Sequence, residues 1–147
     1  MPTAETARWE RETAPVEKWQ QHEGDRELKA EIEHAKAMFG AGDDLDLEGS
    51  PVYSKNTLDR ALAFVSSHSA KGHALCSAYP PAPKIGPGPD GSIDLHWKQK
   101  TWELLVNIPA DDSQMAVFYG DDYGAAKIKG SFDPKTVNLG IVAWLMH

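Results

Sequence analysis

Closely spaced turn signals between Tyr79 and Asp133 restrict this part of the chain to short strands joined by tight turns. The stretch opens with YPPAPKIGPGPDGS, in which prolines and glycines interrupt any regular element. Four segments with alternating apolar residues follow, namely SIDLHWKQ, TWELLVNIP, SQMAVFYG and AAKIKGSF. Short polar or glycine-bearing turns separate them, a pattern typical of an antiparallel meander. We therefore predict a small sheet of about four strands.

The apolar residues of these segments should gather on one face of the sheet, because side chains alternate between faces along a strand. The predicted inner face consists of Ile93, Leu95, Trp97, Trp102, Leu104, Val106, Ile108, Met115, Val117, Tyr119 and Ile128. The opposite face is predicted to be mainly polar, with Leu105 and Phe118 set into it. A face this apolar needs a covering layer of helices, so the predicted fold class is α+β.

Helical patterns occur on both sides of the predicted meander. Residues 13–39 are expected to form a helix that Gly24 splits or loosens. Its apolar stripe consists of Leu28, Ile32, Ala35 and Phe39. A second helix, at about 55–68, is expected to start at Ser54, and a last helix is expected to start at Pro134. These helices should pack on one face of the sheet.

The formal net charge of −7 lies entirely in the first third of the chain. Residues 1–48 carry 13 acidic and 6 basic side chains, whereas residues 49–147 are balanced. We therefore expect an acidic N-terminal helical arm over residues 1–48 and an α+β domain over 49–147, together forming one folding unit. A surface that binds nucleic acid directly is not expected, because backbone phosphates would be repelled.

The remaining composition points to a cytoplasmic protein that needs no metal or cofactor. No apolar run approaches the roughly 20 residues of a membrane span, and the first residues lack the pattern of a signal peptide. Cys76 has no second cysteine with which to form an internal disulfide or a cysteine-rich zinc site. No other spacing of histidine, cysteine or acidic residues predicts a metal site.

Three motifs together resemble a widespread family of small uncharacterised bacterial proteins. They are DLDLEGSPVYS at residues 44–54, TLDRALAFV at 57–65 and PKIGPGPDGSIDLHW at 83–97. The family reads roughly WDGxGAxPIS, then ALxFL, then PxPDGGIxLEW, and this chain departs from it at Leu45 and His96. No assigned activity accompanies the resemblance. Members are familiar as accessory genes of bacteria and their mobile elements, which implies antitoxin-like roles or roles in host–phage conflict.

Two tryptophans in the acidic arm are candidates for contact with a partner. Trp9 and Trp19 lie far from the meander in the sequence, and aromatic residues are enriched at the centres of protein interfaces. The nearby Glu10, Glu12 and Glu17 would suit a partner with a basic surface. The same tryptophans could instead fold back onto the sheet or mediate self-association.

A second candidate site lies on the polar face of the predicted sheet. If the strand that carries His96 approaches the turn after SQMAVFYG, then a base, two acids and two phenols converge. These residues are His96, Tyr119, Asp121, Asp122 and Tyr123. They could form a ligand-binding face or a catalytic site.

The absence of catalytic motifs favours a non-enzymatic protein-interaction module. We expect such a module to act as an antitoxin-like neutraliser, or as an inhibitor of a bacterial toxin or defence protein. Two alternatives stay open, a small-ligand-binding module that uses the open sheet face and an enzyme whose site lies near His96, Asp121 and Asp122.

Overall fold

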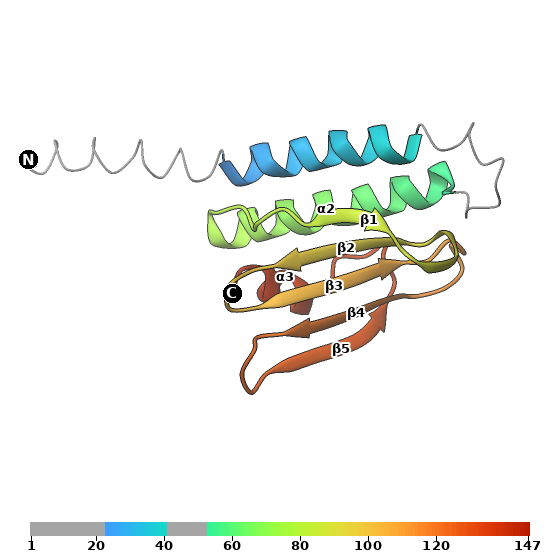
Figure 1. Ribbon diagram of the computed structural model, residues 1–147. Coiled ribbons are helices and arrows are strands. Elements are labelled where there is room, and N and C mark those ends of the chain that lie inside the picture. Colours follow the sequence, from blue (N-terminus) through green and yellow to red (C-terminus); the bar gives the residue numbers. More distant parts are fainter. Residues whose placement is uncertain (1–22, 41–52) are drawn as a thin grey trace, which may run out of the picture.

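A computed structural model describes residues 23–40 and 53–147 as helices layered on one side of an antiparallel sheet (Figure 1). The strands are β1 (Lys84–Pro87), β2 (Ile93–Lys98), β3 (Glu103–Ile108), β4 (Ala116–Asp121) and β5 (Lys127–Phe132). Each strand pairs with its neighbour in sequence, in the order β1-β2-β3-β4-β5. The predicted α+β fold with a meander is therefore confirmed, with five strands in place of four. The additional strand β1 comes from the proline-rich stretch that we expected to be irregular.

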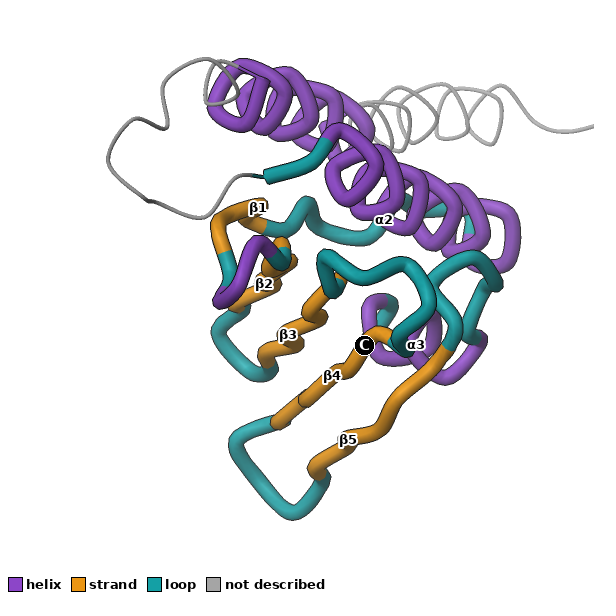
Figure 2. Tube along the Cα trace, turned by 90° about the vertical axis from the view of Figure 1, so that its right-hand side faces the viewer, coloured by secondary structure: helices purple, strands orange, loops and turns teal. Residues whose placement is uncertain are grey.

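The described helices are residues 23–40, α2 (Lys55–Cys76) and α3 (Leu139–Leu145). Figure 2 shows α2 and α3 on the same side of the sheet, with residues 23–40 running alongside α2. Among the described residues, none of the helices has the length and apolar character needed to cross a membrane. The predicted residues Trp9, Glu10, Glu12, Glu17 and Trp19 lie outside the described residues.

Helix α2 begins at the predicted cap and continues beyond its predicted end. The Ser54 side chain accepts a hydrogen bond from the Thr57 amide at 3.1 Å, as expected of an N-cap. The helix then runs to Cys76, because Ser69 and Gly72 stay on its buried face. At Gly72 a Cβ atom would lie 2.8 Å from the Met146 sulfur, so glycine permits close approach there. These small residues do not produce an apolar pattern, which is why the sequence prediction stopped near residue 68.

The hydrophobic core lies between the inner face of the sheet and the helices. Leu28, Ala35 and Phe39 from residues 23–40 are buried in this core, which confirms the predicted stripe. Trp97 is fully buried at the centre, and its Nε1 atom donates a hydrogen bond to the Pro81 carbonyl at 2.9 Å. Residues 23–40 therefore belong to the same core as residues 53–147.

Strand β4 has the opposite phase from the one we predicted. The register pairs Val106 with Phe118 and Leu105 with Tyr119, so Phe118 lies on the inner face and Tyr119 on the outer face. Met115, Val117 and Tyr119 are 52%, 51% and 41% exposed. Ala116 and Gly120 are buried in their place. Because SQMAVFYG carries apolar residues in both phases, alternation alone cannot choose between them.

The final helix starts five residues later than predicted and is short. Asn138 is its N-cap and accepts a hydrogen bond from the Ile141 amide at 3.1 Å. Upstream, the Asp133 side chain accepts from the Lys135 amide at 2.9 Å and forms a turn where the helix was expected. An aspartate that bonds the backbone two residues ahead favours a turn over a helix.

Candidate functional site

The face of the sheet that points away from the helices carries the second predicted site. The register aligns one residue from each strand across this open face, and we call these five residues the central row. They are Lys84, His96, Leu105, Tyr119 and Lys129, in strand order. The row therefore places a cation at each end and an apolar and an aromatic side chain between them.

The rows on either side of the central row are more polar. In one of them, Asn107 Nδ2 donates hydrogen bonds of 2.8 Å to Asp94 Oδ1 and to Ser92 Oγ. That row also contains Val117, which pairs with Asn107. Leu105 is 38% exposed, and together with Val117 and Tyr119 it forms what we call the apolar patch. Side chains of both charge signs surround the patch.

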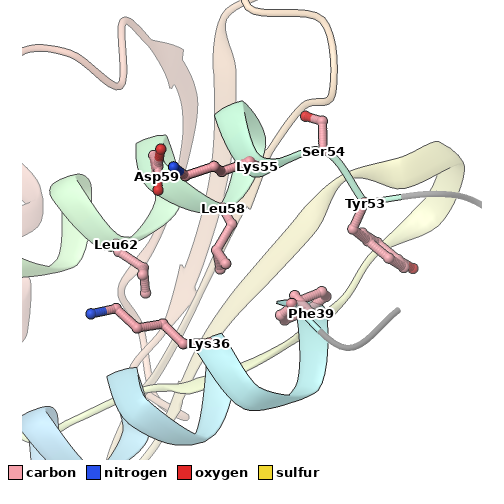
Figure 3. Close-up of a pocket in the computed structure, with 9 residues that line it drawn as sticks. Lys36, Phe39, Tyr53, Ser54, Lys55, Leu58, Asp59 and Leu62 are labelled. Atoms are coloured by element: carbon pink, nitrogen blue, oxygen red, sulfur yellow. The ribbon is translucent and has the colours of Figure 1, made fainter. Parts of the chain in front are cut away.

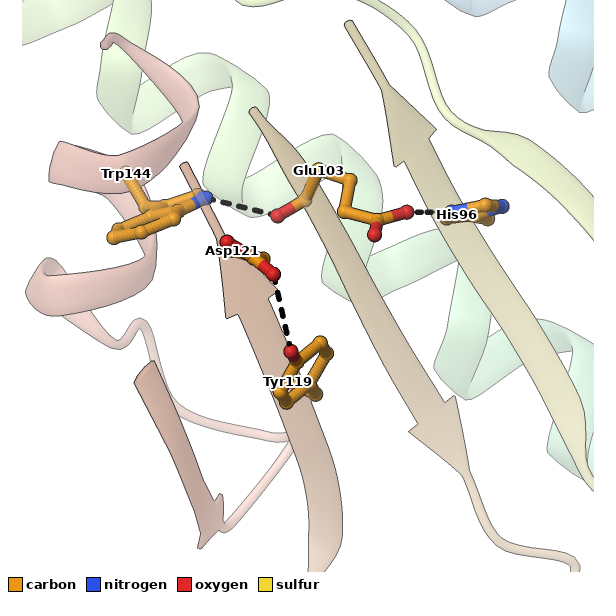
Figure 4. Close-up of polar contacts among 5 residues, drawn as sticks. All are labelled: His96, Glu103, Tyr119, Asp121 and Trp144. Carbon is orange, nitrogen blue, oxygen red and sulfur yellow. Dashed lines mark hydrogen bonds and ion pairs between the residues drawn. The ribbon is translucent and has the colours of Figure 1, made fainter. Parts of the chain in front are cut away.

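His96 forms a polar pair with Glu103 across the β2–β3 hairpin. Its Nε2 atom lies 3.1 Å from Glu103 Oε2, as Figure 4 shows. Both side chains are partly exposed, so the contact lies at the surface. On the opposite side of the backbone, the Glu103 carbonyl accepts a 3.2 Å hydrogen bond from Trp144 Nε1. This hydrogen bond connects β3 to α3.

Tyr119 and Asp121 form a separate polar pair on β4. The Tyr119 hydroxyl donates to Asp121 Oδ2 at 3.3 Å, and Asp121 Oδ1 accepts from the Tyr123 amide at 2.8 Å. Tyr123 has a positive φ of 60° and an exposed ring. Desolvation, and then the Glu103 and Asp121 carboxylates, raise the pKa of the Tyr123 hydroxyl above its ordinary value. The Tyr123 hydroxyl therefore stays protonated at neutral pH.

Asp122 has a structural role in the turn after β4. Its Oδ1 atom accepts hydrogen bonds from the Gly124 amide at 2.9 Å and from the Ala126 amide at 3.1 Å. The structure thus brings Tyr119, Asp121 and Tyr123 together, whereas Asp122 Oδ1 accepts hydrogen bonds from backbone amides of the turn.

Glu103 is the residue of this face that sequence reasoning did not assign to the site. The register of the β2–β3 hairpin could have identified it. Lys98 pairs with Glu103 and His96 pairs with Leu105, so Glu103 is the diagonal neighbour of His96 on the same face. The signal is the short polar connection between these strands, which the Gln99 amide closes by donating to the Trp102 carbonyl at 2.8 Å.

The face offers little that would serve catalysis or metal binding. Within residues 23–40 and 53–147, no group of three or more histidine, cysteine or acidic side chains could hold a metal ion. Glu103 and Asp121 are register partners, but their carboxylates bond different residues, His96 and Tyr119. No serine, threonine or cysteine contacts the His96–Glu103 pair through a hydrogen bond in the described part of the chain.

A hollow of about 260 Å³ lies between residues 23–40 and the start of α2 (Figure 3). The rings of Phe39 and Tyr53 meet edge to face at one end, 5.0 Å between centroids. Lys36 and Leu62 lie at the other end (Figure 3). Because the hollow adjoins the point where the chain leaves the described residues after Gly40, we assign no ligand to it.

No family model, curated protein or solved structure matches this chain. The likeness to small bacterial proteins noted above therefore stays a prediction. Function has to be inferred from the surfaces of the molecule itself.

Proposed function

We propose that this protein binds another protein through the open face of its sheet. The observation that carries the proposal is the apolar patch of Leu105, Val117 and Tyr119, which lies on the face of the sheet turned away from the described helices. Neighbouring inner-face residues such as Leu104 and Val106 are fully buried. Clustered exposed apolar side chains framed by polar ones are typical of contact surfaces, whereas scattered ones need no explanation.

The polar surroundings of the patch support the same proposal. Lys84 and Lys129 end the central row, and the His96–Glu103 and Tyr119–Asp121 pairs border the apolar side chains. Tyrosine is well suited to such a position, because its ring supplies contact area and its hydroxyl supplies a hydrogen bond. Charges of both signs around the patch favour specific binding of a partner in one orientation over nonspecific association.

The hydrogen bonds of the face favour binding over catalysis. His96 is engaged by Glu103, and Asp121 is engaged by Tyr119 and by the Tyr123 amide. An enzyme of the predicted kind would need these groups to converge on one substrate atom, yet they form two separate pairs. The enzyme and small-ligand alternatives therefore have less support than a protein partner.

The kind of partner follows from charge and from the resemblance. The excess negative charge of residues 1–48 is complementary to a basic protein surface. We propose that the protein acts in the cytoplasm as an antitoxin-like neutraliser of a bacterial toxin or defence protein. The predicted contacts from Trp9 and Trp19 would add to the open face in such a complex.

Affinity capture from bacterial lysate tests the proposal when three forms of the full chain are compared. Leu105→Glu places a charge in the apolar patch, and Leu75→Glu makes the same change at an exposed leucine on α2 that is 60% accessible. We expect a partner captured in stoichiometric amount by the wild type and by Leu75→Glu, and its loss with Leu105→Glu. Equal capture by all three forms would contradict the proposal. Circular dichroism melts of the three forms check that each is folded.

A further inference from the structure

The two edge strands of the sheet are protected to different degrees. Strand β1 has four residues, includes Pro87, and its Ile85 amide donates to Glu31 Oε1 at 3.0 Å. That contact satisfies an outward main-chain group, and proline blocks pairing beside it. Strand β5 at the other edge has six residues and no proline. An edge of this kind can accept a further strand.

The outward main-chain groups of β5 can be assigned from the ladder it forms with β4. The Asp122 amide donates to the Ala126 carbonyl at 3.1 Å. Hydrogen-bonded and non-bonded pairs alternate along an antiparallel ladder. With Gly120 opposite Ile128, the main-chain groups of Ile128, Gly130 and Phe132 therefore point toward β4. Those of Lys127, Lys129 and Ser131 point outward, and no other described residue bonds them.

The open-face side of this edge is cationic. Lys127 and Lys129 are exposed there, opposite Asp121 and Tyr119 of β4. A strand added beside β5 would place every second side chain next to these two lysines. Acidic side chains would be favoured at those positions, because opposite charges on adjacent strands attract.

The other side of the same edge is apolar and hollow. A hollow of about 470 Å³ is lined by Phe118, Ile128 and Trp144, along with Lys127, Lys129, Asn138 and Gly140. Gly130 adds no side chain to this space, and a Cβ atom there would lie only 3.0 Å from Phe118 Cε1. The alternate side chains of an added strand would therefore meet aromatic and aliphatic surface.

We propose that β5 binds an extended segment of a partner in which acidic and apolar side chains alternate. The segment would bond the outward main-chain groups of Lys127, Lys129 and Ser131, with its acids beside the lysines and its apolar residues over the hollow. This is a second contact surface, independent of the apolar patch on the open face. A second copy of the chain is a poorer occupant, because pairing two β5 strands gathers four lysines on one face.

Fluorescence anisotropy with the full chain tests this inference. The probes are two labelled peptides, one of alternating aspartate and leucine and one of alternating lysine and leucine. We expect the wild type to bind the acidic peptide preferentially. The double variant Lys127→Glu with Lys129→Glu should lose at least about tenfold in affinity for it and gain affinity for the basic peptide. Loss of fold could not produce that gain. Lys135→Glu, an exposed lysine beyond β5, is the matched control.

A backbone variant tests strand addition itself. Lys129→Pro removes an outward amide, whereas the amides of Ile128, Gly130 and Phe132 still bond β4. The substitution should therefore abolish peptide binding without unfolding the chain. Leu105→Glu should leave peptide binding unchanged, which separates this inference from the open-face proposal. Equal binding of both peptides by the wild type would overturn it. So would unchanged binding by Lys129→Pro, or self-association of the wild type that Lys129→Pro removes.

Discussion

The two halves of the sheet differ in how completely their inner faces are buried. On the inner face of the half made of β1 to β3, Ile93, Leu95 and Leu104 are completely buried beneath the helical layer. On the half made of β4 and β5, Phe118 and Ile128 are only partly buried, and glycines occupy two inner-face positions. Trp144 of α3 packs close to Gly120 of β4, and Phe64 of α2 contacts Phe132 of β5. The half made of β1 to β3 therefore supplies most of the buried apolar residues of the sheet.

This difference separates stability from recognition. Residues that hold the fold together cannot also be remodelled to meet a partner, because interiors are tightly packed. The half with β4 and β5 carries Val117 and Tyr119 on its open face and the unprotected edge. The edge site therefore lies entirely in the half with the less buried inner face, and the apolar patch lies there except for Leu105 of β3. Local opening should also start in this half.

The largest expected effect tests that contrast directly. Leu95→Ala removes a fully buried side chain from β2 and should lower the free energy of unfolding by about 3–4 kcal/mol. Ile128→Ala removes a side chain of similar size from β5, where it is half-buried, and should cost only about 1 kcal/mol. Urea unfolding followed by tryptophan fluorescence measures both changes. Equal losses would show that the two halves contribute alike.

An intermediate effect is expected at the protected edge. Glu31→Ala leaves the Ile85 amide of β1 without its 3.0 Å partner and should cost about 1 kcal/mol. Glu33→Ala is the matched control, because Glu33 lies on the exposed side of the same helix. Thermal unfolding of both variants provides the comparison. A loss as large for Glu33→Ala would mean that helix charge, and not edge protection, explains the result.

The smallest expected effect is a pH dependence of stability at the contact between α2 and the N-cap of α3. His68 of α2 is fully buried, Nδ1 lies 2.8 Å from the Phe64 carbonyl, and Nε2 accepts from the Asn138 amide at 3.0 Å. These contacts require the neutral ring with a proton on Nδ1. Desolvation lowers the pKa of His68 below its ordinary value, partly offset by the Phe64 carbonyl.

The sign of this dependence follows from the lowered pKa. Below about pH 6.5 the unfolded chain binds a proton at this histidine more readily than the folded chain does. Stability should therefore fall as the pH drops from 7 toward the folded-state pKa. Urea midpoints at pH 7.5 and 5.5 measure the change, and His68→Asn should show a smaller change. An equal change in that variant would assign the pH dependence to other groups.

Sequence patterns predicted the first half of the sheet better than the second. In β2, polar residues alternate strictly with apolar ones, and in β3 only Leu105 departs from the alternation, so the faces followed from periodicity. In β4 both phases are apolar, and only pairing with β3 decides that Phe118 faces inward. The proposed edge site depends on Gly130 and on the ladder with β4, neither of which leaves a periodic signal. Tertiary pairing therefore controls the region that carries the proposed edge site.

The link between His68 and the cap of α3 also has a consequence for the order of folding. Every strand pairs with its sequence neighbour, so the sheet can assemble through short-range contacts that close quickly. A seven-residue helix is not stable on its own, and the contact that positions it spans 70 residues of chain. We therefore expect α3 to dock late in folding, so that the aromatic surface of β4 and β5 stays uncovered until then. A folding intermediate of this protein would expose that surface to aggregation.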